Sequence, residues 1–241
     1  MLFIVRFNNN TIIFLYLNIY IHNIHIHIHI LGLTFRMFYG QFTPPQDKYL
    51  YDALLNYENG VSIEAGASNG ILENNTYFFE KNLNWKTINI EPLPSWYAEL
   101  TINRPNSINI NCCLHPYFSD VPVDFYSPNI NFYGNKNHLG SLNFSNLNKT
   151  HASNKISKIK CNTITFNDVV KKCNLDKLDL FVLDIEGYEL EFLKTFNEWT
   201  LYPNVFVIEV GHIDESAVNS LISHKYNFFG KHFVNNIYVR K

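Results

Sequence analysis

The sequence predicts an α/β fold built on a mostly parallel sheet with an antiparallel edge. From residue 37 onward, short apolar runs alternate with helix-like segments at the spacing of βαβ units. The runs are apolar throughout, which is typical of parallel strands covered on both faces. The terminal segment YNFFGKHFVNNIYV favours a hairpin around Gly230 over another crossover. The 241 residues suffice for one such domain and a tail.

The expected elements follow one another in regular order. We expect strands at Val61–Ala65, 87–90, 108–112, Leu180–Leu183 and Val205–Glu209. We expect helices between them at about 75–82, 95–103, 166–173, 188–199 and 215–224.

A first helix precedes these strands in the segment TPPQDKYLYDALLNY. Thr43 and Gln46 have the spacing of a capping box at its start. The apolar positions that follow at helical spacing are Leu50, Ala53, Leu54 and Tyr57. This pattern predicts a helix that covers the sheet.

Residues 115–160 interrupt the alternation, because they are rich in Asn, Ser, Tyr and Pro and show little periodicity. A stretch of this length inside a compact domain is usually a functional loop, a lid or a disordered insert. Ligands of doubly wound sheets bind at the carboxyl ends of the strands, where such an insert could close over them. We therefore expect a loop-rich insert that governs substrate selectivity.

Residues 1–36 form an apolar tail that ends in an alternating Ile-His run. A low-complexity segment or a misassigned start before Met37 is the preferred explanation. A membrane anchor at 11–33 has a suitable length, but it would carry several His and Asn side chains into hydrocarbon. A signal peptide lacks a small-residue cleavage site. The least favoured option is a metal site formed by His22, His25, His27 and His29. We expect a cytoplasmic protein, anchored to a membrane only if 11–33 is a real span.

Charge and cysteine content exclude several classes of site. The formal net charge is −2, so there is no basic field of the kind that holds nucleic acid, and no nucleic-acid partner is expected. The cysteines show neither a CxxC pair nor the His/Cys spacing of a zinc module. We expect reduced, buried thiols at Cys112, Cys113, Cys161 and Cys173.

The stretch SIEAGASNG places an acid and two glycines at the end of the first strand. Gly66 permits a tight turn and Gly70 permits close approach of a ligand, but the spacing is not the GxGxxG of dinucleotide sites. The Glu64 carboxylate would repel a pyrophosphate and attract an ammonium group. Glu91 ends the second strand, where a carboxylate can accept hydrogen bonds from two ribose hydroxyls. Together these features fit S-adenosylmethionine. The alternative is that Glu64 only accepts hydrogen bonds from loop N–H groups.

Two blocks of the sequence resemble the FkbM family of S-adenosylmethionine-dependent methyltransferases. The first is VSIEAGASNGILENNTYFFEKNLNWKTINIEPLPSWYAELTINRPNS, and the second is LDLFVLDIEGYELEFLKTF, with TITFNDVV before it. They cover residues 46–111 and 163 to about 209 of a domain expected at 37–241. The resemblance implies a class I methyltransferase (Rossmann-like) fold. This is a three-layer sandwich around a seven-stranded, mostly parallel sheet whose C-terminal strand is antiparallel.

The resemblance also implies cofactor contacts. They fall in the turn, at the following helix start and near the ribose and adenine: Glu64, Gly66, Ser68, Asn69, Gly70, Asn75, Glu91 and Cys112. Trp96 or Tyr97 could stack on the adenine. The family often has Asp where Asn69 stands and Ser where Asn74 stands, which weakens the expected charged contact to the cofactor's amino group.

Asp184 and Glu186 follow the fourth strand and are the candidate catalytic residues. Asp184 is expected to accept the proton of the acceptor or to position it. Glu186 has a structural alternative, because acids are favoured in the first turn of a helix. Asp184 and Glu209, with His212 nearby, could also hold a divalent cation such as magnesium, although such carboxylates often bind only water or backbone.

The predicted function is S-adenosylmethionine-dependent O-methylation of a small-molecule or sugar hydroxyl, so the expected partner is a small-molecule or glycan acceptor. The first alternative is a catalytically silent protein of the same fold that acts as a membrane-associated interaction or trafficking module. The apolar tail and Asn69 favour it, and it predicts no cofactor binding. A nicotinamide-dependent oxidoreductase is disfavoured by Glu64 and by the missing third glycine.

Overall fold

The computed structural model describes residues 2–7, 11–18, 27–34, 36–128, 140–145 and 156–241. The chain divides into two compact units, Met1–Phe38 and Tyr39–Lys241. The first unit is an antiparallel sheet of three strands, β1 (Leu2–Phe7), β2 (Thr11–Asn18) and β3 (His27–Thr34). β2 and β3 occupy much of the candidate span 11–33, whereas His22 and His25 lie outside the described residues. Within the described ranges, no helix is long and apolar enough to cross a membrane.

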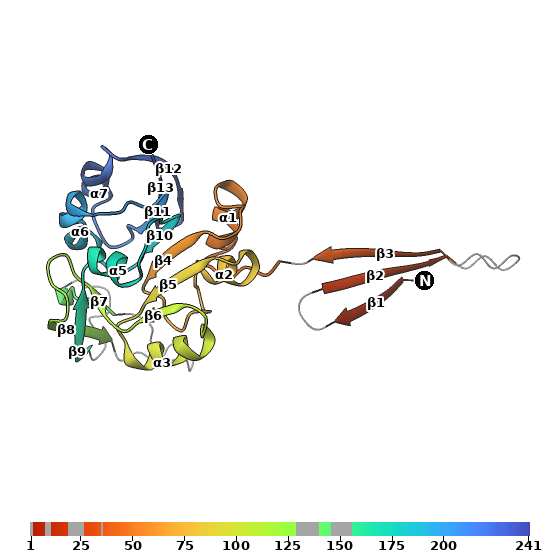
Figure 1. The fold of residues 1–241 in the computed structure, drawn as a ribbon, viewed down its shortest axis with the longest axis horizontal. Helices are drawn as coiled ribbons and strands as arrows, with labels where there is room; N and C mark the ends of the chain where they lie inside the picture. The colour runs from red at the N-terminus through yellow and green to blue at the C-terminus, as the bar shows by residue number, and fades with distance from the viewer. Residues whose placement is uncertain (1, 8–10, 19–26, 35, 129–139, 146–155) are drawn as a thin grey trace, which may run out of the picture. The chain divides into compact units, whose positions relative to one another are not determined.

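The second unit is built on a seven-stranded sheet in the order β12-β13-β11-β10-β4-β5-β6 (Figure 1). Strands β10, β11, β4, β5 and β6 are parallel, and the last strand, β13, pairs antiparallel with β11 and β12. This arrangement confirms the predicted fold class. The strands are β4 (Val61–Ala65), β5 (Lys86–Ile90), β6 (Ile108–Ile110), β10 (Leu180–Leu183), β11 (Val205–Glu209), β12 (Tyr226–His232) and β13 (Asn235–Arg240).

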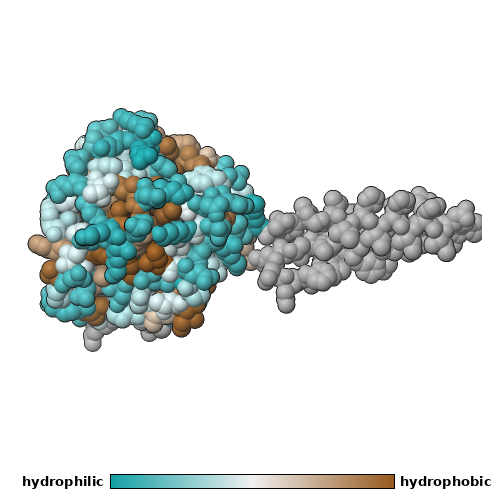
Figure 2. All heavy atoms as spheres, in the orientation of Figure 1, coloured by the Kyte–Doolittle hydropathy of each residue, from teal (hydrophilic) through white to brown (hydrophobic). Residues whose placement is uncertain are grey.

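Helices cover both faces of this sheet. Figure 1 shows α5, α6 and α7 on one side and α1 and α2 on the other. On the first side Phe181 of β10 is fully buried and stacks on Phe166 and Phe206, with ring centroids 5.4 and 5.2 Å away. Figure 2 shows a mostly hydrophilic surface on the second unit, with apolar side chains near the middle of the side in view. The helices are α1 (Gln46–Ala53), α2 (Tyr77–Leu83), α3 (Pro94–Asn103), α5 (Phe166–Lys172), α6 (Glu189–Phe192) and α7 (Glu215–Ile222).

Three local predictions were wrong. The helix expected at 188–199 is a single α-turn, α6, that continues as a 3-10 helix, η1 (Leu193–Glu198). The capping box is absent: Pro45 is the N-cap of α1, and buried Gln46 instead accepts a hydrogen bond from Asn235 of β13. The C-terminal hairpin turns at Phe233, with φ of 55°, whereas Gly230 lies at a register shift inside β12.

The segment expected to be loop-rich contributes a second sheet. Strands β7 (Cys113–Leu114), β8 (Pro122–Pro128) and β9 (Ile156–Ile164) pair in the order β7-β9-β8. Its polar residues face outward, since Lys158 and Lys160 each lie 2.7 Å from a carboxylate oxygen of Asp124. The chain then leaves β9 directly into α5, where Thr165 caps the helix by accepting a hydrogen bond from Asp168 N.

The order of the main sheet reverses between β4 and β10, the first and fourth strands along the chain. The crossovers on either side of this point run in opposite directions, which opens a crevice beyond the carboxyl ends of the two strands. Ligands of doubly wound sheets bind in such crevices. The segments after Ala65 and Leu183 therefore define the place to examine for a site.

Candidate active site

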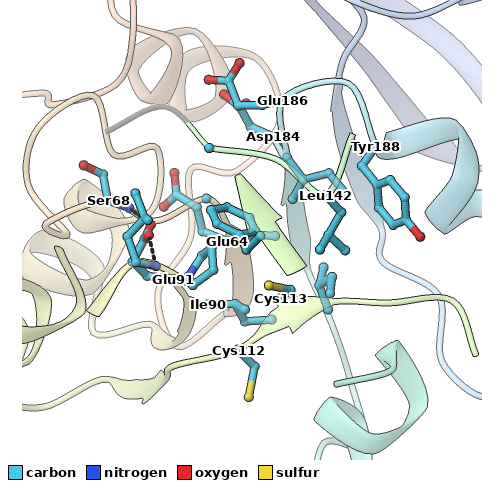
Figure 3. A pocket seen from close by; sticks show the side chains of 18 of the residues that line it. Glu64, Ser68, Ile90, Glu91, Cys112, Cys113, Leu142, Asp184, Glu186 and Tyr188 are labelled. Atoms are coloured by element: carbon cyan, nitrogen blue, oxygen red, sulfur yellow. Dashed lines mark hydrogen bonds between the residues drawn. The ribbon is translucent and has the colours of Figure 1, made fainter. Parts of the chain in front are cut away.

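A cavity lies at this reversal point, with an empty volume of about 930 Å³ that includes space open to solvent. Its walls come from the ends of β4, β5 and β10 and from the second sheet (Figure 3). The predicted site residues that line it are Glu64, Gly66, Ser68, Asn75, Glu91, Cys112, Asp184 and Glu186. Asn69 and Gly70 do not line it, nor do Trp96 and Tyr97.

Gly66 is required by the packing of neighbouring strand ends. Its φ is 83°, and a Cβ there would lie 2.1 Å from the carbonyl oxygen of Asp184. The N–H groups of Gly66 and Ala67 both donate to the carbonyl of Ile90. The turn after β4 is thus held tightly between β5 and β10, which explains the glycine without any ligand contact.

Gly70 and Asn69 serve the other end of the same turn. A Cβ on Gly70 would lie 2.5 Å from Leu100 and 2.6 Å from Arg104, so α3 needs the glycine for close packing. The side-chain oxygen of Asn69 accepts hydrogen bonds from the N–H groups of Ile71 and Leu72, at 3.1 and 2.9 Å. Asn69 therefore shapes the loop as an Asx turn rather than facing the cavity.

Glu64 holds the start of α2. Its buried carboxylate accepts hydrogen bonds from the backbone N–H and side-chain amide of Asn75, and from the backbone N–H and hydroxyl of Thr76. Burial raises the pKa of Glu64, while these hydrogen bonds and the charge of Arg104 oppose that rise. Two donors on each oxygen use the lone pairs of the carboxylate. This geometry matches the alternative in which Glu64 satisfies loop N–H groups.

Glu91 keeps hydrogen-bonding capacity that Glu64 lacks. One of its oxygens accepts from Ser68 N at 2.9 Å and the other from Leu93 N at 2.8 Å, which leaves a lone pair on each oxygen. Burial raises the pKa of Glu91 to about 8. The buried hydroxyl of Ser68 has no hydrogen-bond partner in the described part of the chain. Two polar groups with unused capacity thus lie on the same wall.

The opposite side of the cavity carries Asp184 and Glu186 (Figure 3). Burial, together with the charges of Glu64 and Glu73, raises the pKa of Asp184 to about 7. Burial and the charge of Asp184 raise the pKa of Glu186 well above its usual range. Glu186 also has a φ of 57°, a left-handed backbone that is uncommon for Glu. The loop after β10 thus carries two acids for which burial and the surrounding negative charges favour the neutral form.

Sequence reasoning missed the apolar wall. It is formed by residues of the second sheet and of neighbouring loops: Cys113, Leu114, Phe125, Leu142 and Tyr188. Cys112 follows β6, which ends at Ile110, and Figure 3 shows its sulfur directed away from the acidic side chains. All four cysteines are free thiols; Cys113, Cys161 and Cys173 are buried as predicted, whereas Cys112 is only half-buried. The alternation in VPVDFYS, which buries Phe125, was the one signal for this wall.

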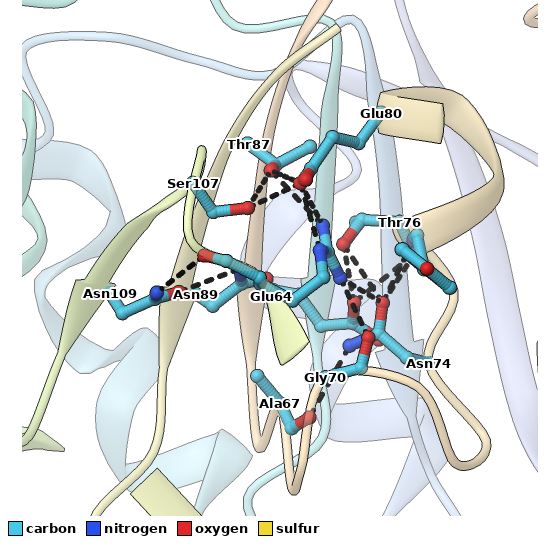
Figure 4. Close-up of polar contacts among 12 residues, drawn as sticks. Glu64, Ala67, Gly70, Asn74, Thr76, Glu80, Thr87, Asn89, Ser107 and Asn109 are labelled. Atoms are coloured by element: carbon cyan, nitrogen blue, oxygen red, sulfur yellow. Dashed lines mark hydrogen bonds and ion pairs between the residues drawn. The ribbon is translucent and has the colours of Figure 1, made fainter. Parts of the chain in front are cut away.

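A buried arginine, which sequence reasoning also missed, supports the turn. Figure 4 labels its partners Glu80, Gly70 and Asn74. Arg104 follows α3, is fully buried and pairs with Glu80 of α2, with Nε 2.8 Å from Oε2. It also donates to the carbonyl of Gly70 at 2.9 Å and to the side-chain oxygen of Asn74 at 3.0 Å. The same Asn74 oxygen accepts from the N–H groups of Thr76 and Tyr77, so Arg104 fixes the start of α2.

We predict that Arg104→Met lowers the free energy of unfolding by about 3–5 kcal/mol, because it leaves the Glu80 carboxylate in a largely buried site without its cation. The matched control is Lys48→Met, which removes an exposed ion pair with Asp52. It should change stability by less than about 1 kcal/mol. Urea unfolding followed by circular dichroism measures both. Equal effects of the two substitutions would contradict the role given to Arg104.

We also predict that Glu91 makes stability fall with rising pH. Its pKa is raised from 4.5 to about 8 in the folded protein, so its contribution is complete below 4.5 and is lost as the pH rises through 8. Between these values the slope from this one group approaches 1.4 kcal/mol per pH unit. Urea unfolding at several pH values should give a flatter profile for Glu91→Gln than for the wild type. Parallel profiles would rule out a neutral Glu91.

Comparisons with known proteins identify the family of the chain. The sequence profile of the methyltransferase FkbM domain matches residues 64–233. A search of curated proteins gave no significant match. Similar solved structures include a fibrillarin pre-rRNA processing protein of Methanococcus jannaschii, at 13% identity and a TM-score of 0.41, covering 100% of this chain and 98% of that chain. The METTL16 MTase domain is 9% identical with a TM-score of 0.41, and the match covers 82% of this chain and 67% of that chain. A SAM-dependent methyltransferase of Leishmania major is 12% identical with a TM-score of 0.38, and the match covers 80% of this chain and 69% of that chain.

The assignment rests on the domain match and not on these structural likenesses. The matched region covers more than half of the chain and contains the turn after β4, Glu91 and the acids after β10. The chain therefore belongs to the FkbM methyltransferase family, and the protein is an S-adenosylmethionine-dependent methyltransferase.

Proposed function

We propose that the enzyme methylates a hydroxyl oxygen of a small molecule or sugar in the cavity beyond β4, β5 and β10. The observation that carries this proposal is the position of Asp184. Its carboxylate lines the cavity and receives no hydrogen bond from any described residue. A carboxylate with free lone pairs can accept a hydrogen bond from an acceptor hydroxyl.

The residues opposite Asp184 fit the cofactor. The unused lone pairs of Glu91 suit the two ribose hydroxyls, and the Ser68 hydroxyl offers a further donor or acceptor. Glu64 has no such capacity left, so it supports the loop and does not bind the cofactor's ammonium group. The bound cofactor would supply an electrophilic methyl group on its sulfonium.

The contribution of the protein to methyl transfer is alignment and removal of one proton. An in-line displacement needs the acceptor oxygen held against the methyl group, which the walls of the cavity can provide. Asp184 would hold the acceptor hydroxyl, and with a pKa of about 7 it could take the proton near neutral pH.

The lining favours a neutral acceptor. In their ionised forms, which the proposal requires of Glu91 for the ribose and of Asp184 for proton removal, these acids repel an anion. Phe125 and Tyr188 offer apolar contacts to a sugar ring or a similar compound. The formal net charge of −2 argues against a nucleic-acid acceptor.

We expect saturable binding of S-adenosylmethionine to the full-length protein in calorimetric titration. Glu91→Ala should weaken binding by at least roughly tenfold, because it removes the acceptor of two hydrogen bonds. Glu58→Ala, at an exposed acid remote from the cavity, is the matched control. No binding by folded wild-type protein would favour the catalytically silent alternative.

The affinity for S-adenosylmethionine should rise with pH up to about 8. Ribose hydroxyls bind the ionised form of Glu91, so binding below the pKa of about 8 must release a proton. The gain approaches about tenfold per pH unit. Titrations at pH 7 in buffers of different ionisation enthalpy measure the released proton. The release should shrink in Glu91→Gln, and an unchanged value would contradict this linkage.

Transfer of a labelled methyl group to a panel of hydroxylated compounds tests the reaction itself. A hydroxyl acceptor gives a methyl ether that survives mild alkali, whereas a carboxyl acceptor gives an ester that is hydrolysed. Asp184→Asn should lower kcat by roughly a hundredfold or more while cofactor binding remains. Label that is released by alkali, or full activity of Asp184→Asn, would refute the proposal.

A further inference from the structure

Three acids from neighbouring elements meet beside the cavity. Asp184 follows β10, Glu209 ends β11, and Glu189 begins α6. The register pairs Leu183 with Ile208, so the two strands bring Asp184 and Glu209 to the same edge of the sheet. One side-chain oxygen from each of the three acids lies within 4.8 Å of the others.

Two of these carboxylates are buried and incompletely satisfied. Glu189 is fully buried, and its Oε1 accepts hydrogen bonds from Ile185 N at 2.8 Å and Gly187 N at 3.3 Å. Its Oε2 has no partner within the described residues. Glu209 is 7% exposed, and its Oε2 also lacks a partner there. Buried polar atoms are rarely left in this state unless a water or an ion completes them.

No lysine or arginine of the described chain pairs with Asp184, Glu189 or Glu209. The nearest basic group is His212, whose Nε2 lies 3.7 Å from an oxygen of Glu209 and 3.7 Å from an oxygen of Glu186. Glu186, Glu209 and His212 also bring their ligand atoms within 4.8 Å of one another. Glu209 therefore belongs to two groups of potential ligands.

We propose that a hard divalent cation, such as Mg²⁺ or Mn²⁺, binds between Asp184, Glu189 and Glu209, with His212 and Glu186 on its outer side. Oxygen atoms that bind one such ion at about 2.0–2.6 Å lie at most about 4–5 Å apart, so the observed spacing admits an ion. Carboxylate oxygens are the ligands that these ions prefer. The ion would satisfy both unpartnered oxygens and offset the repulsion among the acids.

The position of the site gives it a use in the reaction. Asp184 lines the cavity as well as belonging to the acidic cluster, so the ion would lie at the edge where the acceptor binds. With one Asp184 oxygen on the ion and the other left to accept the proton of the hydroxyl, the ion would bind the acceptor oxygen and favour its deprotonated form. An acceptor with two adjacent oxygens could chelate it. This last step rests on the proposed function, whereas the binding of the ion does not.

Titration of the full-length protein with Mn²⁺, without cofactor or acceptor, tests the site. The paramagnetic resonance signal of free Mn²⁺ disappears on binding, so it counts bound ions directly. We expect one saturable site, weakened at least roughly tenfold in Glu209→Gln and in Asp184→Asn. The control is Glu198→Gln, at an exposed acid that ends η1. It should bind Mn²⁺ like the wild type.

Thermal unfolding distinguishes a loss of Mn²⁺ binding from a folding defect in the variants. Mn²⁺ should raise the melting temperature of the wild type and of Glu198→Gln, and should raise that of folded Glu209→Gln far less. Absence of saturable binding to the wild type, or equal binding by Glu209→Gln, would overturn the cation site. S-adenosylmethionine binding without Mn²⁺ binding would remove the cation and leave the proposed function intact. Mn²⁺ binding without S-adenosylmethionine binding would remove the proposed function and leave the cation site intact.

Discussion

The guanidinium of Arg104 carries a charge into the interior, and such a charge persists only if its donors are paired. Glu80 supplies the counter-charge, while the carbonyl of Gly70 and the side chain of Asn74 take further donors. Asn74 in turn accepts a hydrogen bond from the backbone N–H of Thr76, the N-cap of α2. The N–H and hydroxyl of Thr76 also donate to Glu64. The cavity wall at the end of β4 is therefore held by a chain of hydrogen bonds that begins at α3.

The sheet was predictable because its determinants are local. Each parallel strand is a short apolar run, and each is found within a few residues of its expected place, from Val61–Ala65 to Val205–Glu209. Both glycines of the turn were also predicted to matter, Gly66 for a tight turn and Gly70 for the close approach of a ligand. Close packing requires both of them, since Gly66 meets the backbone of Asp184 and Gly70 meets the side chains of Leu100 and Arg104. A glycine pattern alone does not distinguish a close ligand from a close neighbour.

The rest of the site depends on contacts between distant residues. Glu189 lies in the first turn of α6, where an acid is ordinary, and only the fold brings it to Glu209. Arg104 and Glu80 are 24 residues apart, and no periodicity relates them. Asn69 is adjacent to residues that line the cavity, yet its side chain completes a turn. The insert lacked continuous apolar runs because one face of its sheet is exposed and charged, which leaves only a short alternation of apolar and polar residues.

The cavity has walls of two origins. Glu64, Glu91 and Asp184 stand at the edge of the main sheet, whereas Cys113, Phe125 and Leu142 come from the segment inserted between β6 and α5. In the described part of the chain, β7, β8 and β9 stay outside the strand pairing of the main sheet, although Leu114 and Ile164 pack into its core. Substitutions in the insert can therefore reshape one half of the cavity and leave the other unchanged. This division gives the fold a modular route by which related enzymes could diverge in the compounds they accept.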